Sequence, residues 1–273
     1  MRKVLRSLVP AVAAVLLTIS PSAVAPHSTT AVAQSTDAGK DNQILADVQN
    51  NVLNRSQFKN VKASVQNGVV TLTGTVDVYS QKENLDRRVH RIKNIKGVEN
   101  EVEVAGPEVT DAALQNKLVR AIQYDRVGYS SGSLRIRDVT PFNAISVGVR
   151  NGVVTLGGHA YGPVDADSAV AVAANTPGVK DVINNIQVDP VSPMDDRIRI
   201  DVFRSVYGFP TLNKYAIDPG KPIRISVQNG HVTLYGVVDS QADKDAAGIR
   251  ANSVAGVFSV TNDLQVVGQP AKK

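Results

Sequence analysis

Apolar and polar residues alternate in the same way at three places along the chain, and each place predicts a β-hairpin. Around Asn67-Gly68, apolar residues stand at every second position, so that Val65 would pair with Val70 and Ala63 with Leu72. Asn-Gly between two alternating runs indicates a two-residue type I′ turn, because both central residues need a positive φ. The same pattern surrounds two further turns, Asn151-Gly152 and Asn229-Gly230.

Helical periodicity flanks each predicted hairpin. Apolar residues four positions apart precede the hairpins: Ile44, Val48 and Val52, then Leu114, Leu118 and Ile122, then Ile198, Val202 and Val206. A second helical stretch follows each hairpin and ends in a short alternating run, Asn-x-apolar-x-Val. The pattern therefore predicts an α+β fold. Its three tandem αββαβ units would each have a three-stranded mixed sheet with two helices on one face.

The three copies keep a fixed spacing. From the turn glycine to the asparagine of the last strand there are 32 residues each time, from Gly68 to Asn100, Gly152 to Asn184 and Gly230 to Asn262. Equal spacing without gaps marks one structural unit used three times. We place the units at residues 41–105, 111–189 and 194–268, with a tail at 269–273. One departure is Asn94, which stands where the other copies have Gly178 and Gly256.

These residues resemble the BON domain, a small α+β module of bacterial exported and envelope proteins. The resemblance rests on the Asn-Gly hairpin, the glycine six residues after the turn glycine (Gly74, Gly158 and Gly236), and the Asn-x-apolar-x-Val strand. It implies a non-enzymatic role at the cell envelope, similar to that of osmotically inducible periplasmic proteins. It further implies association with phospholipid and a response to osmotic or envelope stress.

The N-terminus predicts export. Arg2, Lys3 and Arg6 precede an apolar run that is shorter than the ~20 residues of a membrane span, and small residues follow it. This is the pattern of a cleavable signal peptide, which we place at residues 1–33, with a disordered linker at 34–40. We expect a periplasmic or secreted protein without a transmembrane span, and without a lipid anchor because there is no cysteine.

Insertions distinguish the second and third copies from the first. Relative to the first copy, the second carries 14 extra residues, placed in 123–143, and the third carries 8, placed in 207–221. Aromatic and basic side chains gather there: Tyr124, Tyr129, Arg135, Arg137 and Phe142, then Tyr207, Phe209 and Tyr215. Such side chains suit a membrane or protein interface, and they equally suit a cover over a small core. Both interpretations stay open from sequence.

A basic run in the second helix of copy one is the other candidate surface. It contains Arg87, Arg88 and Arg91 and has no counterpart in the other copies. It predicts contact with anionic headgroups or, alternatively, an ordinary solvated helix face. The net charge of +5 adds little, since removing the signal peptide's three cations leaves 27 basic and 25 acidic residues. A nucleic-acid partner, which needs a concentrated basic face, is therefore not expected.

Residues for catalysis are missing from the pattern. The absence of cysteine excludes disulfides, thiolate metal sites and cysteine nucleophiles, and the four histidines have no metal-ligand spacing. Ser130 lies in Gly-x-Ser-x-Gly, but the strand that must precede a nucleophile elbow is not predicted there. We expect no enzyme, cofactor or metal. The expected partner is anionic phospholipid or an envelope protein, the alternative function is a stress-induced periplasmic holdase, and the oligomeric state stays open.

Overall fold

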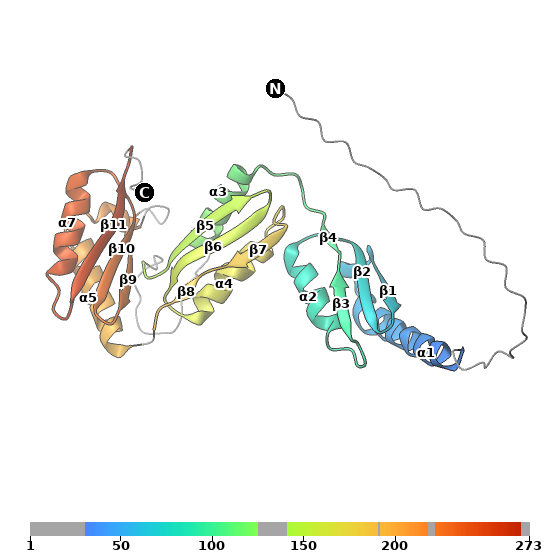
Figure 1. The fold of residues 1–273 in the computed structure, drawn as a ribbon. Coiled ribbons are helices and arrows are strands. Elements are labelled where there is room, and N and C mark those ends of the chain that lie inside the picture. The colour runs from blue at the N-terminus through green and yellow to red at the C-terminus, as the bar shows by residue number, and fades with distance from the viewer. Residues whose placement is uncertain (1–30, 125–140, 191, 218–221, 269–273) are drawn as a thin grey trace, which may run out of the picture.

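The computed structural model describes residues 31–124, 141–190, 192–217 and 222–268, which form three α+β units in chain order (Figure 1). The first unit contains α1 (Ala31–Val48), the short helices η1 (Gln49–Leu53) and η2 (Ser56–Phe58), β1 (Val61–Gln66), β2 (Val69–Val76), α2 (Tyr79–Val89), β3 (Gly97–Asn100) and β4 (Glu103–Val104). The second contains α3 (Asp111–Tyr124), β5 (Ala144–Arg150), β6 (Val153–Ala160), α4 (Pro163–Ala174), β7 (Asp181–Asn184) and β8 (Gln187–Val188). The third contains α5 (Pro193–Tyr207), α6 (Lys214–Ile217), β9 (Arg224–Gln228), β10 (His231–Val238), α7 (Gln241–Asn252) and β11 (Ser259–Val266).

Each sheet is mixed, as the sequence predicted. The hairpin strands are antiparallel, and the last strand runs parallel to the central one, with β2, β6 and β10 in the centre. Val65 faces Val70 and Ala63 faces Leu72, so the predicted register is confirmed in the first unit, and the equivalent pairs form in the others. In the first two units the last strand is divided by two residues, whereas β11 is continuous.

The glycines six residues after each turn have a role in the backbone of the hairpin. Glycine on the buried face of a sheet often indicates that another element, such as a helix, approaches closely. Instead, these residues have positive φ (110° at Gly74, 83° at Gly158 and 132° at Gly236), and a β-carbon would collide with a backbone carbonyl just before or at the start of the first strand. Only glycine combines this conformation with this close approach. The backbone of the hairpin, and not helix packing, therefore demands it.

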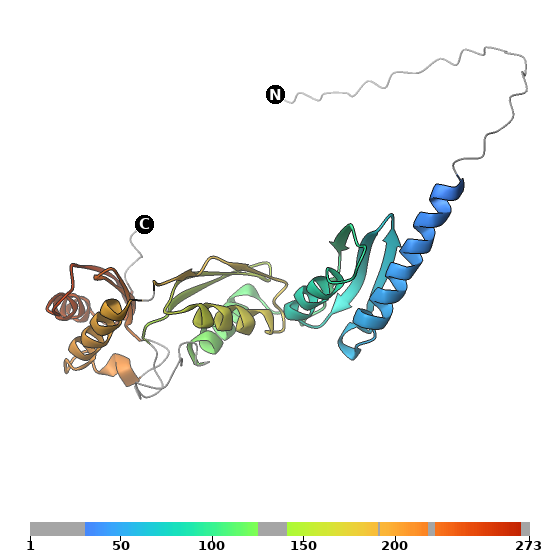
Figure 2. The same ribbon diagram turned by 90° about the horizontal axis from the view of Figure 1, so that it is seen from below.

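Both helices of a unit cover the same face of its sheet. In the first unit Val48 of α1 and Leu85 of α2 share one buried cluster with Val70 and Leu72 of β2. Figure 2 shows this layering for the second unit, in which α3 and α4 lie below the strands. Helix starts follow local chemistry only in part. Ser240 caps α7 by accepting a hydrogen bond from the Asp243 amide, whereas Ser80, a residue type that also favours N-caps, lies inside α2.

Helix α1 begins before the first predicted unit, and the turn before β3 keeps its conformation with Asn94 in place of glycine. Residues 34–40, expected as a disordered linker, lie within the bounds of α1 (Ala31–Val48). Asn94 adopts φ 64°, the left-handed conformation that Gly178 and Gly256 adopt in the other units. Asparagine tolerates this region better than most residues. The substitution of asparagine for glycine therefore leaves the turn intact.

The first and second units meet at the start of α2. The Ser80 hydroxyl of α2 lies 2.7 Å from the Asn175 side-chain oxygen at the end of α4. Tyr79 packs against the core of the second unit and makes a hydrogen bond with the Asp181 side chain. Both side chains that α2 contributes to this joint lie in its first turn.

The second and third units share a buried network of charged groups. Asp189, just after β8, has a fully buried side chain, and its Oδ2 lies 3.3 Å from Nη2 of Arg199 on α5. The same carboxylate accepts hydrogen bonds from Ser226 at 2.9 Å and Gln228 at 2.8 Å. His159 of β6 lies 3.1 Å from its other oxygen. A buried charge must be compensated, and here the compensating groups come from both units.

Aromatic rings extend this joint. Phe142, just before β5, packs against the core of the third unit, and its ring centroid lies 6.3 Å from that of Phe203. Tyr161 lies 5.9 Å from Phe142 and under the Arg199 guanidinium at 5.0 Å. The Ile225 amide donates a 2.5 Å hydrogen bond to the Pro141 carbonyl. This joint is both more buried and more extensively hydrogen-bonded than the contact between the first two units.

Candidate functional site

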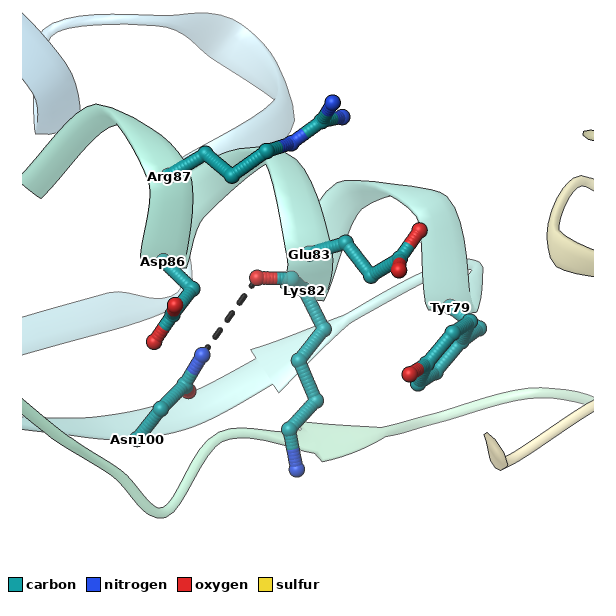
Figure 3. A pocket seen from close by; sticks show the side chains of 6 residues that line it. All are labelled: Tyr79, Lys82, Glu83, Asp86, Arg87 and Asn100. Atoms are coloured by element: carbon teal, nitrogen blue, oxygen red, sulfur yellow. Dashed lines mark hydrogen bonds between the residues drawn. The ribbon is translucent and has the colours of Figure 1, made fainter. Parts of the chain in front are cut away.

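A groove of about 340 Å³ runs along α2 of the first unit (Figure 3). Its lining comes from one face of α2 and the end of β3: Tyr79, Lys82, Glu83, Asp86, Arg87 and Asn100. The Asn100 side-chain amide donates to the Lys82 carbonyl at 3.3 Å, which ties the strand to the helix (Figure 3). Asn100 is the asparagine of the sequence landmark. This residue therefore shapes the groove as well as the strand.

The groove combines charges of both signs with one phenol. Lys82 and Arg87 supply two cations, and Glu83 and Asp86 supply two carboxylates. Burial, followed by the hydrogen bond to Asp181, raises the pKa of Tyr79 well above its usual value, so the phenol stays neutral at physiological pH. The groove therefore offers cations, carboxylates and one neutral phenol, which suit a polar, charged ligand.

The predicted basic run continues from this groove over the end of α2. Arg87 and Arg91 are exposed, and Arg91 lies just beyond the last residue of the helix, Val89. Arg88 is half-buried, and its Nε donates to the Asn84 side chain at 2.7 Å. Across the described part of the chain, neither Arg87 nor Arg91 has an ion-pair partner within 4.0 Å. Within these residues neither guanidinium is therefore held in an ion pair, while the carboxylates of the groove lie nearby.

The aromatic residues of the third unit's insertion lie in or against its core. Tyr207 is buried and donates to the Ile223 carbonyl at 2.6 Å. Tyr215 is buried and donates to Asp243 at 2.8 Å, while its oxygen accepts the Asp239 amide at 2.7 Å. Phe209 is partly buried beneath the Arg250 guanidinium, 5.4 Å from its ring centroid. In this conformation the two tyrosine rings offer no surface to a partner.

The described residues include the two ends of the second unit's insertion. Phe142 lies in the joint with the third unit, and Tyr124 is the last residue of α3. Tyr129, Arg135, Arg137 and Ser130 lie outside the described residues. The structure thus separates the basic residues of α2 from the aromatic residues of the third unit and does not bring them into one site.

Sequence reasoning missed a carboxylate that holds every Asn-Gly turn. Each of the three turns has positive φ at both central residues. In each unit one aspartate accepts both turn amides at 2.7–2.9 Å: Asp41 from Asn67 and Gly68, Asp111 from Asn151 and Gly152, and Asp195 from Asn229 and Gly230. We name these contacts the turn clamps. The signal was available, because each aspartate stands three residues before the first buried apolar residue of its helix, as in Asp41 and Ile44.

Neither a membrane-spanning helix nor a metal-ion site is recognisable in the described residues. None of the helices in these ranges is long and apolar enough to cross a membrane. Within the same ranges, no group of three or more histidine, aspartate or glutamate side chains is placed to hold a metal ion.

Comparison with known families matches the three units. A model of the BON domain matches residues 40–106, 132–190 and 211–268, together more than half of the chain. The chain belongs to the BON domain family. The matches to the second and third BON units begin later than α3 and α5, because these units carry insertions before their hairpins.

Two relatives and one solved structure are similar to this BON protein. Osmotically-inducible protein Y of Escherichia coli (strain K12) is 34% identical over 122 residues, which cover 44% of this chain and 61% of the relative. An uncharacterized protein in the gshII 5′ region of Anaplasma centrale is 27% identical over 150 residues, covering 54% of this chain and 94% of the relative. The C-terminal domain of CdsD, a structural protein of the type III secretion system of Chlamydia trachomatis, is 15% identical with a TM-score of 0.23. That match covers 82% of this chain and 97% of the other.

Proposed function

We propose that this BON protein is an exported, non-enzymatic protein of the cell envelope that associates with anionic phospholipid or a membrane-associated partner during osmotic or envelope stress. Export through a signal peptide at residues 1–33 would place it in the periplasm or outside the cell. Its similarity to an osmotically inducible protein supports the stress role. The contact with lipid is assigned to the basic end of α2.

The exposed cations at the end of α2 and just beyond it are the observation that carries the lipid proposal. Arg87 and Arg91 project from one unit without ion-pair partners in the described residues, and their counterparts in the other units are uncharged: Ala171 and Asn175, then Ile249 and Ser253. A basic residue close to an anionic membrane gains about 1 kcal/mol. Two such residues together supply about 2 kcal/mol, which is a roughly thirtyfold gain in partitioning.

Cosedimentation with vesicles tests this proposal. The mature chain is mixed with vesicles of phosphatidylglycerol and phosphatidylcholine, or of phosphatidylcholine alone, at low and high salt. We expect binding to the anionic vesicles only, weakened by salt because exposed charges are screened. Arg87→Gln/Arg91→Gln should weaken binding about thirtyfold.

A matched variant separates the α2 surface from overall charge. Lys117 and Arg120 are exposed on α3 of the second unit, and Lys117→Gln/Arg120→Gln removes the same charge there. This variant should bind nearly as well as the unmodified chain. Equal weakening by both variants would show a diffuse charge effect, and absence of binding to anionic vesicles at low salt would refute the proposal.

A further inference from the structure

The same end of each unit presents two side chains beside the Asn-Gly turn. One is the side chain of the residue immediately before the aspartate of the turn clamp. The other belongs to the residue whose amide donates to the carbonyl of the turn glycine, at 2.8 Å for Lys96, 2.9 Å for Lys180 and 2.9 Å for Phe258. We call each such pair a turn tip. The three turn tips are Lys40 with Lys96, Thr110 with Lys180, and Met194 with Phe258.

The third turn tip is apolar where the others are polar or basic. Phe258 is 80% exposed and Met194 71% exposed, which are the two highest values for large apolar residues in the described ranges. The Phe258 ring lies against Gly230, where a β-carbon would come within 2.5 Å of the ring, so the turn packs against one part of the ring. The aspartate of this tip, Asp195, is buried in its turn clamp and brings no exposed negative charge.

Two exposed polar side chains neighbour this apolar pair, one three residues after Met194 on the same helix and one beside Phe258. Arg197 is exposed one turn into α5, and His231 is exposed at the start of β10, with its ring centroid 6.0 Å from that of Phe258. The neighbouring carboxylate, Asp196, is paired with Arg199 at 2.6 Å. Apolar side chains beside a cation match the boundary between acyl chains and headgroups of an anionic bilayer.

We infer that the third turn tip inserts Phe258 and Met194 into the headgroup–acyl boundary of an anionic lipid bilayer. This inference rests on the proposed phospholipid association and names a second contact for it. A bilayer is favoured over a second protein chain by area. One aromatic ring buries about 150–250 Å², and with one methionine beside it the tip stays far below the ~1,200 Å² total of a stable protein interface. In a bilayer a small insertion suffices when a second, electrostatic contact accompanies it.

A single tryptophan tests the insertion, because the chain contains no tryptophan of its own. Phe258→Trp and, at the equivalent position of the second tip, Lys180→Trp are each titrated with equimolar phosphatidylglycerol–phosphatidylcholine vesicles. With the first variant we expect a shift of the emission to shorter wavelength and quenching by acyl-brominated lipid. The second variant should keep the emission of a water-exposed indole. Met194→Ser/Phe258→Ser, whose positions are exposed, should weaken partitioning about tenfold and leave the circular dichroism spectrum unchanged.

The outcomes distinguish this inference from the proposed function. If the unmodified chain binds the vesicles while Phe258→Trp shows neither shift nor quenching, the insertion is refuted and the lipid association stands. Equal vesicle affinity of the double serine variant leads to the same conclusion. A shift that appears without vesicles and grows with protein concentration would assign the tip to a second copy of the chain. Absence of any vesicle binding removes both proposals.

Discussion

Removing one turn clamp should destabilise its own hairpin by an amount that depends on burial. Asp195 is 1% exposed and accepts the Asn229 amide at 2.9 Å and the Gly230 amide at 2.8 Å. Asp195→Ala therefore deletes two hydrogen bonds to a carboxylate and leaves the buried Gly230 amide without its acceptor. Hydrogen bonds to charged groups contribute about 1.5–3 kcal/mol each. We expect a loss of about 3 kcal/mol, because water entering the space left by the side chain recovers part of the total.

The first unit provides the comparison for this variant. Asp41 makes the same two contacts at 2.7 Å, but it is only partly buried, and the Asn67 contact is exposed. Solvent replaces much of what Asp41→Ala removes, so about 1 kcal/mol should be lost. Both variants change the same atoms of the same motif, and they differ in burial.

Amide hydrogen exchange measured on the full chain reads out each hairpin separately. Asp195→Ala should reduce protection in β9 and β10 and leave β1 and β2 at their original rates, while Asp41→Ala should do the reverse with a smaller effect. Urea unfolding gives the total change in free energy. Equal losses for the two variants would refute the burial argument. Unchanged protection in both hairpins would show that the clamps do not stabilise the turns.

Two further predictions concern the joint and the response to acid. Arg199→Ala leaves the Asp189 carboxylate buried without its cation. The free energy of unfolding, measured in urea, should fall by about 3–5 kcal/mol, and the segment after β8 should become more sensitive to protease. Unchanged cleavage would contradict a coupled joint. Hydrogen bonds from the Gly152 and Asn151 amides lower the pKa of Asp111 in the folded state. The ionised carboxylate therefore stabilises the folded state fully above about pH 4, and this stabilisation is lost as the pH falls through the folded pKa. Asp111→Asn should flatten this acid dependence in the second unit's amide exchange, and an unchanged acid profile would contradict the assignment.

Local signals made the fold readable from sequence. The Asn-Gly pairs fixed the hairpin register, because a one-residue slip would move Val70 and Leu72 to the other face of the sheet. Periodicity placed Val48 and Leu85 in the same core. Both signals act over a few residues. They occur three times because each unit packs its helices against its own sheet.

Contacts between units were not readable, because they depend on placement and not on local pattern. Phe58 and Phe142 stand at equivalent positions, three residues before Val61 and Ile145. Phe58 is 1% exposed in the core of its own unit, whereas Phe142 packs against the core of the next unit. Nothing in the neighbouring sequence indicates which of the two rings packs within its own unit and which packs against the next unit.

The aromatic insertions show the same limit. From sequence, a tyrosine in a polar connecting segment is compatible with a surface site or with a core position. In the structure, the Tyr207 hydroxyl is buried and donates to the Ile223 carbonyl. The groove on α2 was missed for a related reason. Its wall needs Asn100, which follows Lys82 by 18 residues and reaches it only after β3 has paired with β2.

The two joints give the proposed membrane contacts different mechanical roles. A buried network around Asp189 and Arg199 couples the second and third units, so the apolar tip of the third unit is carried by a pair of units. The basic end of α2 belongs to the first unit, which meets the second at Tyr79 and Ser80. Each membrane contact alone is weak, and their affinities multiply only if both reach the bilayer together. The two contacts therefore add to one another only in an orientation of the units that brings the basic end of α2 and the third turn tip to the same bilayer.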